Sequence, residues 1–113
     1  MSLWGDIEDC LEDLDRVNAT AVKYGRDMVI AEARYYSAKA EEAFSLKQDG
    51  YAVTFIEMVI KGVPRVSSAL TEYHMAQIEY ENARDCVNVL KKKLTALCDQ
   101  YQREWSQSGL RGQ

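Results

Sequence analysis

The stretch IEDCLEDLDRVNATAVKYGRDMVIAEARYYSA, residues 7–38, repeats apolar or small residues at alternating steps of three and four. Its repeat positions are Ile7, Cys10, Leu14, Val17, Ala21, Tyr24, Met28, Ala31, Tyr35 and Ala38. A second repeat of the same spacing comprises Val66, Ala69, Tyr73, Ala76, Tyr80, Ala83, Val87, Leu90, Leu94, Leu97 and Tyr101. A period of about 3.5 residues keeps such positions on one face of a helix. The sequence therefore predicts two long helices that pack lengthwise.

The region between the two repeats interrupts this pattern. Lys47 to Gly50 predict the end of the first helix, because a base in the last turn and a glycine able to adopt positive φ are typical of helix C-termini. Thr54 and Glu57 have the spacing of a capping box and predict a short helix, and Pro64 suits the first turn of the next one. We expect a single all-α domain, 1–113, built as a long antiparallel, coiled-coil-like hairpin with a short connecting helix. Its expected segments are helices at about 6–48, 54–61 and 64–105 and a flexible tail at 106–113.

The apolar residues outside the two repeats predict self-association. Two helices alone bury only a narrow stripe each, so a monomer would have a thin core. Val29, Phe44 and Val89 lie outside the repeats and would leave a large apolar patch in water. We therefore expect a homo-oligomer. The predicted interface residues are Phe55, Ile56, Val59, Leu90, Leu94, Leu97 and Tyr101.

Residue types that carry catalysis or bind metals are few and lack the necessary spacing. His74 is the only histidine, and Cys10, Cys86 and Cys98 are widely separated. Glycine-rich phosphate loops and Glu-x-x-His pairs do not occur in the sequence. We expect a protein that is not an enzyme, with no cofactor, no metal and no small-molecule substrate.

Two features predict a cytoplasmic location. No stretch approaches the roughly 18 uncharged residues of a membrane span, and Met1 to Trp4 lead into acidic residues rather than into a signal peptide. An odd number of widely spaced cysteines is typical of small buried side chains in a reducing compartment. We expect no association with a membrane.

The N-terminal segment is strongly acidic. Six acids precede Arg16, the first base, and the whole chain has a net charge of -4. Acids near a helix N-terminus interact favourably with the helix dipole, which is one explanation of the pattern. The alternative is an arm that docks in a basic groove of a protein partner. The candidate partner-binding residues are Trp4, Asp6, Glu8, Asp9, Glu12 and Asp13.

A run of lysines in the second long helix suggests binding to nucleic acid. Consecutive residues spread over about 200° of a helix, so such a run is often only a solvated face. The pI near 5.0 argues against strong phosphate binding by a monomer. An oligomer changes the argument, because repeated small patches add their phosphate contacts. The candidate nucleic-acid-binding residues are Lys47, Lys61, Arg65, Lys91, Lys92, Lys93 and Arg103.

Several short motifs follow one another from Tyr35 onward. They are YYSAKAEE at 35–42, GYAVT at 50–54, KG at 61–62, EYENA at 79–83, and the lysine run that leads to QREW at 102–105. Over about 70 of its 113 residues the chain thereby resembles small proteins encoded by phages and prophages of Gram-positive bacteria. It is more weakly similar to the UvsY recombination mediators, helical phage proteins that oligomerise, bind single-stranded DNA and help to load a recombinase. This chain differs from them in being acidic.

The resemblance implies an early phage function in the cytoplasm of a bacterial host. Our first hypothesis is a non-enzymatic accessory protein of recombination or replication, of the mediator type. It would be an oligomer that binds single-stranded DNA and a recombinase or a single-strand-binding protein. The alternatives are a helical adaptor or host-factor inhibitor that uses its acidic arm, and a structural coiled coil.

Overall fold

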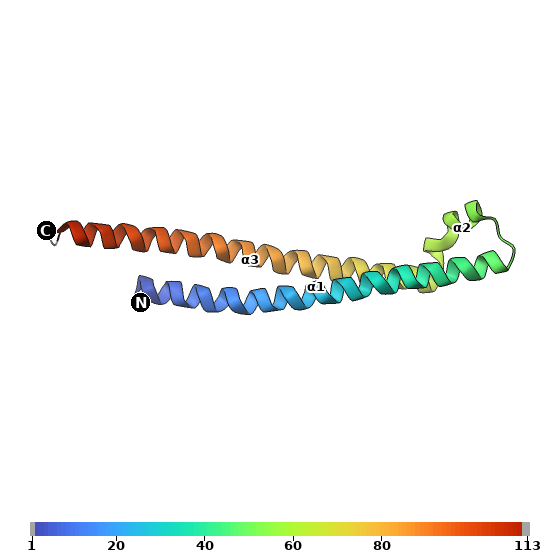
Figure 1. The fold of residues 1–113 in the computed structure, drawn as a ribbon, viewed down its shortest axis with the longest axis horizontal. Coiled ribbons are helices and arrows are strands. Elements are labelled where there is room, and N and C mark those ends of the chain that lie inside the picture. Colours follow the sequence, from blue (N-terminus) through green and yellow to red (C-terminus); the bar gives the residue numbers. More distant parts are fainter. Residues whose placement is uncertain (1, 112–113) are drawn as a thin grey trace. The chain divides into compact units, whose positions relative to one another are not determined.

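The computed structural model describes residues 2–111 of the chain and the side chains of residues 2–107. Its elements are α1 (Leu3–Gln48), α2 (Val53–Val59), the 3-10 turn η1 (Ile60–Gly62) and α3 (Pro64–Arg111). The chain divides into two compact units, which we call unit 1 (Met1–Val22 and Asn82–Gln113) and unit 2 (Lys23–Glu81). Both long helices contribute to each unit, and within each unit their segments run antiparallel (Figure 1). The predicted all-α architecture, with two long helices and a short connecting helix, is confirmed.

The two heptad-spaced repeats line the side of each long helix that is withdrawn from solvent. In unit 1 the buried residues are Ile7, Cys10, Ala21, Ala83 and Val87. In unit 2 they are Ala31, Tyr35, Ala38, Ile56, Ile60 and Val66. Every other repeat position is half-buried. The sequence prediction of both packing faces is therefore confirmed.

Large and small residues alternate on these faces and let the helices approach closely. A Cβ atom added to Gly25 of α1 would lie 3.2 Å from the ring of Tyr80 on α3, so the aromatic ring rests on the bare backbone of the glycine. In unit 1 the Cys10 thiol donates to the Leu90 carbonyl, with a sulfur-to-oxygen distance of 3.6 Å. This thiol is 1% exposed, as predicted for a small buried side chain, whereas Cys98 is half-buried and the prediction is wrong for Cys86, which is exposed.

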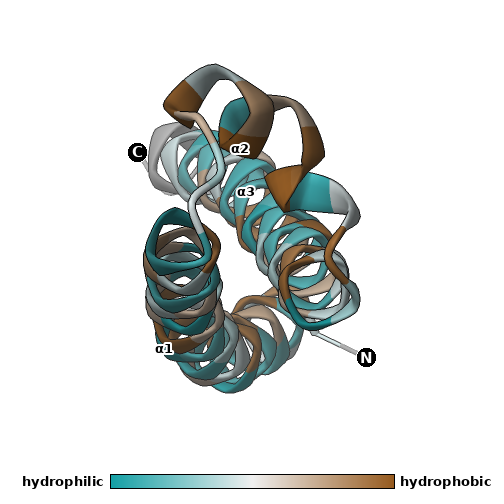
Figure 2. Ribbon diagram, turned by 90° about the vertical axis from the view of Figure 1, so that its right-hand side faces the viewer, coloured by the Kyte–Doolittle hydropathy of each residue, from teal (hydrophilic) through white to brown (hydrophobic). Residues whose placement is uncertain are grey.

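The short helix α2 adds a third element to unit 2. Ile56 of α2 and Ile60 of η1 pack with Tyr35 and Val66 into one buried cluster. The opposite side of α2 remains exposed, and Figure 2 shows the brown, hydrophobic ribbon of this segment. Unit 2 therefore has a core of three elements, whereas unit 1 has the packing of α1 against α3.

The turn after α1 forms as the glycine predicts. Gly50 has a φ of 95°, in the left-handed region that favours glycine. The amide of Gly50 donates to the Lys47 carbonyl at 3.1 Å, and the amide of Tyr51 donates to the Leu46 carbonyl at 3.2 Å. These two bonds form a Schellman motif, which satisfies carbonyls left free at the helix end. Pro64 is the first residue of α3, also as predicted.

Three helix boundaries differ from the predictions. α1 begins at Leu3 rather than near Asp6, because the Ser2 hydroxyl caps it by accepting a hydrogen bond from the Gly5 amide at 3.0 Å. The predicted capping box is wrong, because α2 starts at Val53 after Ala52, which makes no side-chain cap. α3 continues to Arg111 rather than ending near Trp105, since no proline follows to stop it and a glycine costs only about 1 kcal/mol. Of the predicted flexible tail, residues 106–111 are helical and 112–113 lie outside the described residues.

Candidate functional site

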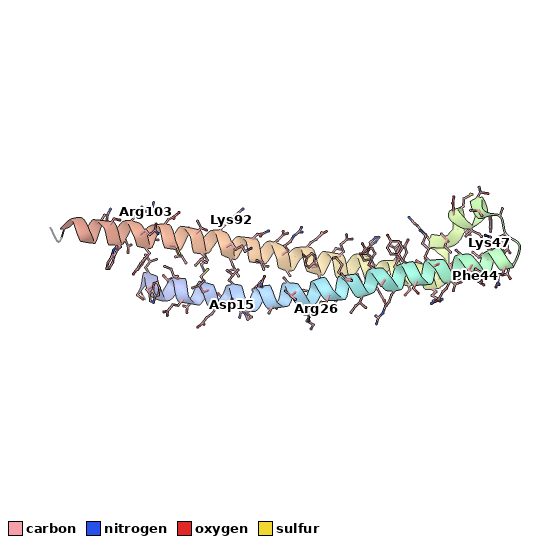
Figure 3. The ribbon with its side chains drawn as sticks, viewed as in Figure 1. Asp15, Arg26, Phe44, Lys47, Lys92 and Arg103 are labelled. Carbon is pink, nitrogen blue, oxygen red and sulfur yellow. The ribbon has the colours of Figure 1, made fainter. Side chains whose placement is uncertain are left out.

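Four of the candidate nucleic-acid-binding residues lie on α3 in unit 1. Lys91, Lys92, Lys93 and Arg103 are all exposed. Lys92 and Arg103 point away from α1 (Figure 3). They are separated by three helical turns, or about 16 Å at 1.5 Å per residue, so they share one outer face. Asp99 is exposed between them, which leaves this face basic but not uniformly so.

The other three candidate basic residues lie in unit 2. Lys47 and Lys61 are exposed next to the connector. Arg65 is an ion-pair partner instead: its Nη2 lies 2.6 Å from Oε2 of Glu41, and its Nη1 lies 3.6 Å from Oε1 of Glu42. The hydrogen bond and charge of Glu41 raise the pKa of Arg65 above its ordinary value. Arg65 is therefore neutralised locally, and the seven predicted residues do not form one cluster within either unit.

Unit 2 contains a polar groove that the sequence did not predict. It has a volume of about 330 Å³ and lies between α1 and α3. Its lining includes Arg34 and Ser37 of α1 and Arg65, Ser68 and Glu72 of α3. Arg34 directly precedes the repeat position Tyr35. This is the only sequence signal that could have predicted its place beside α3. Glu41 and Glu42, which pair with Arg65, and Glu72 offset the positive charge of the groove.

The acidic segment is a packed helix rather than a free arm. Ile7 and Cys10 are buried between its acids, and Trp4 contacts Tyr101 of α3 with ring centroids 5.6 Å apart. Glu8, Asp9 and Glu12 are exposed, whereas Asp6 and Asp13 are half-buried. The apolar positions hold the segment on unit 1, so any partner would bind its exposed acids on a formed helix.

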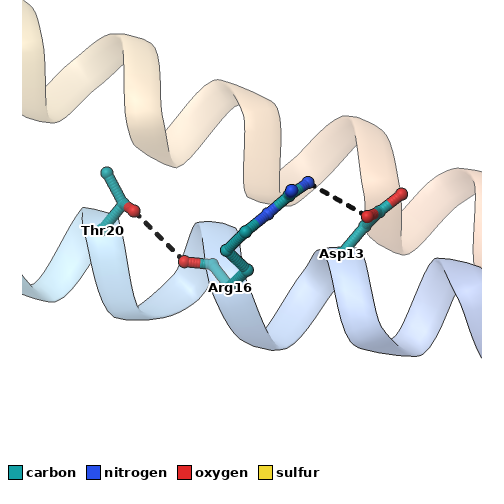
Figure 4. Close-up of polar contacts among 3 residues, drawn as sticks. All are labelled: Asp13, Arg16 and Thr20. Carbon is teal, nitrogen blue, oxygen red and sulfur yellow. Dashed lines mark hydrogen bonds and ion pairs between the residues drawn. The ribbon is translucent and has the colours of Figure 1, made fainter.

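One of these acids is also paired within α1. Nη2 of Arg16 donates to Oδ1 of Asp13 at 3.0 Å, and the Thr20 hydroxyl donates to the Arg16 carbonyl at 3.2 Å (Figure 4). Both contacts join residues one helical turn apart. They support the helix locally and leave Glu8 and Glu12 as the exposed acids opposite the packed face.

The residues predicted to form an oligomer interface differ in exposure. Phe55 is 44% exposed, whereas Val59 is half-buried and Ile56 is 6% exposed within the core of unit 2. Leu90, Leu94, Leu97 and Tyr101 are half-buried positions of the second repeat in unit 1. Assigning Ile56 to an interface is therefore corrected, because its side chain already packs against Tyr35 and Val66.

Aromatic side chains gather at one flank of unit 2. The ring centroids of Tyr35 and Tyr73 lie 6.2 Å apart, so these two rings join α1 to α3. Each ring also contacts the next aromatic residue along its own helix: the centroid of Tyr36 lies 5.1 Å from that of Tyr35, and the centroid of His74 lies 5.9 Å from that of Tyr73. The ammonium of Lys39 lies 5.9 Å from the Tyr35 ring centroid. Desolvation, followed by the charge of Glu32, raises the pKa of Tyr73.

Neither a metal centre nor a membrane span is found in the described part of the chain. Among residues 2–111 no group of three His, Cys, Asp or Glu side chains is arranged to hold a metal ion. No helix within the same range combines the length and the apolar character needed to cross a membrane. Comparison of the chain with known protein families, curated proteins and solved structures finds no match.

Proposed function

We propose that this chain is a non-enzymatic accessory protein of phage recombination or replication, which self-associates and holds single-stranded DNA on the outer face of α3 in unit 1. The observation that carries the proposal is the basic face around Lys92 and Arg103. Both side chains point into solvent, away from the helix that α3 packs against (Figure 3). Phosphate contacts supply most of the affinity of non-specific nucleic-acid binding, and lysine and arginine make them.

An exposed aromatic residue supports a single strand rather than a duplex as the ligand. Trp105 is 71% exposed and lies two residues after Arg103, about 200° around the helix, so a strand held by Arg103 reaches it by curving around α3. Bases of a single strand stack on such rings, which adds binding energy independent of sequence. The motifs shared with phage proteins, and the weaker similarity to recombination mediators, support the assignment to recombination or replication.

Repetition of the face by self-association compensates for its small size. Two or three phosphate contacts per chain give weak binding, particularly in a chain with a net charge of -4. Several copies aligned along one strand add their contacts, because the later contacts are intramolecular. A recombinase or a single-strand-binding protein is the expected protein partner of the assembly.

The test is fluorescence anisotropy of a labelled oligonucleotide with variants matched in charge. Lys92→Ala/Arg103→Ala and Lys23→Ala/Arg26→Ala each remove two exposed cations, so their net charges are equal. We expect the first variant to bind about tenfold more weakly and to reduce the salt slope by about 1.4, at 0.7 per contact for single strands. Equal weakening by both variants, or no binding by the parent at micromolar protein, refutes the DNA-binding proposal.

A second candidate function is protein binding by the acidic face of α1. Its supporting observation is the exposure of Glu8, Glu12 and Asp15, of which Asp15 points away from α3 (Figure 3). In this case the chain is an adaptor or an inhibitor of a host factor. Changing Glu8 and Glu12 to Gln and Asp15 to Asn should abolish capture of the partner and leave oligonucleotide binding unchanged or stronger. If the chain is instead a structural coiled coil, neither set of variants should change the binding of any ligand.

A further inference from the structure

The outer side of α1 in unit 2 has an apolar stripe of its own. Val29, Ala33, Tyr36, Ala40 and Phe44 follow one another at steps of three or four, and all are exposed. Val29 is 61% exposed, Tyr36 55% and Phe44 62%. These positions lie roughly opposite Ala31, Tyr35 and Ala38, which face the core. A stripe with this spacing on a straight helix is the contact face of a helix partner.

Residue size along the stripe identifies that partner. Large and small side chains alternate in the order Val29, Ala33, Tyr36, Ala40, Phe44. When two copies of the stripe run antiparallel around a two-fold axis between positions 34 and 35, Tyr36 lies opposite Ala33 of the second copy. Val29 then lies opposite Ala40 of the second copy, so a large residue meets a small one at both of these pairs, and Phe44 lies opposite Gly25, outside the stripe. The stripe is complementary to itself, as an interface with two-fold symmetry requires.

The exposed part of the stripe sets the size of the interface. Aromatic side chains bury roughly 150–250 Å² each when fully covered. Tyr36 is 55% and Phe44 62% exposed, so each can bury roughly 80–150 Å² more. With Val29 and the adjacent Ile30, two copies of the stripe bury several hundred Å², which is the size of a small interface. None of the five stripe residues is charged, and the nearest charges on the same helix face are Arg26 and Lys47 at its two ends.

We propose that the stripe Val29-Ala33-Tyr36-Ala40-Phe44 binds the same stripe of a second copy in antiparallel orientation. The self-association assumed in the proposed function is thereby assigned to the outer face of α1, not to α2 or to the second repeat. This inference deepens the oligomeric part of that function and does not depend on DNA.

Sedimentation equilibrium at micromolar concentration tests the interface with two matched valines. Val29→Glu introduces a carboxylate on the stripe, and Val89→Glu introduces one at a position on α3 that is 64% exposed. We expect the parent and Val89→Glu to sediment as dimers, and Val29→Glu to dissociate at least about 100-fold more readily, because two carboxylates are desolvated per dimer. Far-UV circular dichroism at the same concentration shows whether both variants remain helical.

A rescue variant tests the antiparallel register. In Val29→Glu/Ala40→Lys each glutamate lies opposite a lysine of the second copy, so the dimer should return to within about tenfold of the parent affinity. A parallel arrangement places Glu opposite Glu and gives no recovery, which would overturn the proposed register. A parent mass of 12.9 kDa would refute self-association altogether, and a dimer that resists Val29→Glu, or responds equally to Val89→Glu, would refute this interface alone. Oligonucleotide anisotropy remains the separate test of DNA binding.

Discussion

Units 1 and 2 share the same two helices but differ in how their cores are completed. Unit 1 buries Ile7, Cys10 and Val87 between α1 and α3. Unit 2 adds α2, so that Ile56 and other residues enclose Val66, whose side chain is fully buried. Among the described side chains, the two helices of unit 1 fully bury the small Cys10, whereas the added helix α2 allows full burial of the larger Val66 in unit 2. The same heptad pattern therefore gives different local stability in the two units.

The two units also present different outer faces. In unit 1 the exposed charges of α1 are mostly acidic and those of α3 mostly basic, as Glu12 and Lys92 illustrate. In unit 2 the exposed face of α1 is apolar and includes Tyr36 and Phe44. This difference leads us to assign ligand contacts to unit 1 and contacts between copies to unit 2.

Identical substitutions at two buried valines should give the largest difference between the units. Val66 is 0% exposed in unit 2 and Val87 is 6% exposed in unit 1. We expect Val66→Ala to lower the free energy of unfolding by about 2.5 kcal/mol and Val87→Ala by about 1.5 kcal/mol, because a cavity enclosed by three elements cannot collapse. Urea unfolding at one fixed protein concentration measures both. Equal losses would show that α2 adds no enclosed core.

Two connector glycines should differ because of backbone conformation alone. An added Cβ meets no atom within 4 Å at Gly50 or at Gly62, but only Gly50 has a positive φ. Gly50→Ala should therefore cost about 1 kcal/mol, and Gly62→Ala should be close to neutral. Thermal melts of the two variants give the comparison. A neutral Gly50→Ala would contradict the left-handed conformation of residue 50.

Ion pairs should contribute a smaller effect, and only at low salt. Arg65→Ala removes contacts to Glu41 and Glu42 that join α3 to α1, whereas Arg16→Ala removes a contact to Asp13 within α1. We expect a small decrease in melting temperature for Arg65→Ala and a smaller one for Arg16→Ala, because exposed pairs are weak. Both decreases should vanish in about 1 M NaCl, where the Debye length falls to about 3 Å. A decrease that persists at high salt would point to lost packing of the Arg65 stem instead.

The smallest effect should be the response of unit 2 to alkaline pH. Desolvation raises the pKa of Tyr73 above its ordinary value of 10.0, so the folded state favours the neutral phenol. This contribution to stability is complete below pH 10.0 and is lost as the pH rises through that value towards the folded-state pKa. Tyr73→Phe should therefore lose less stability than the parent as the pH rises above 10.0. Parallel curves for the two proteins would contradict the raised pKa.

Helix positions and packing faces could be predicted from the sequence because the signals are local. The spacing of apolar residues such as Tyr35 and Val66 depends only on helix geometry, and both positions are buried. Gly50 and Pro64 act through their own backbone preferences, and both lie where those preferences require. The capping box failed because Thr54 and Glu57 fall inside a helix that already begins at Val53.

The candidate site was less predictable because it depends on neighbours distant in the sequence. Nothing local distinguishes Arg65, which is paired with Glu41, from Lys61, which is exposed beside it. Likewise, Ile56 and Phe55 are adjacent apolar residues, and only the packing of α2 buries the first and exposes the second.

The sequence by itself determined that the chain forms two long helices joined by a turn at Gly50, and which face of each helix packs. Periodicity and backbone preference act within a few residues, so they can be read without coordinates. Tertiary structure alone decided that α2 completes a core in unit 2, that Glu41 neutralises Arg65, and which apolar side chains stay in solvent. These outcomes depend on which elements meet in space. Once Glu41 pairs with Arg65, for example, that guanidinium is no longer available to a phosphate group.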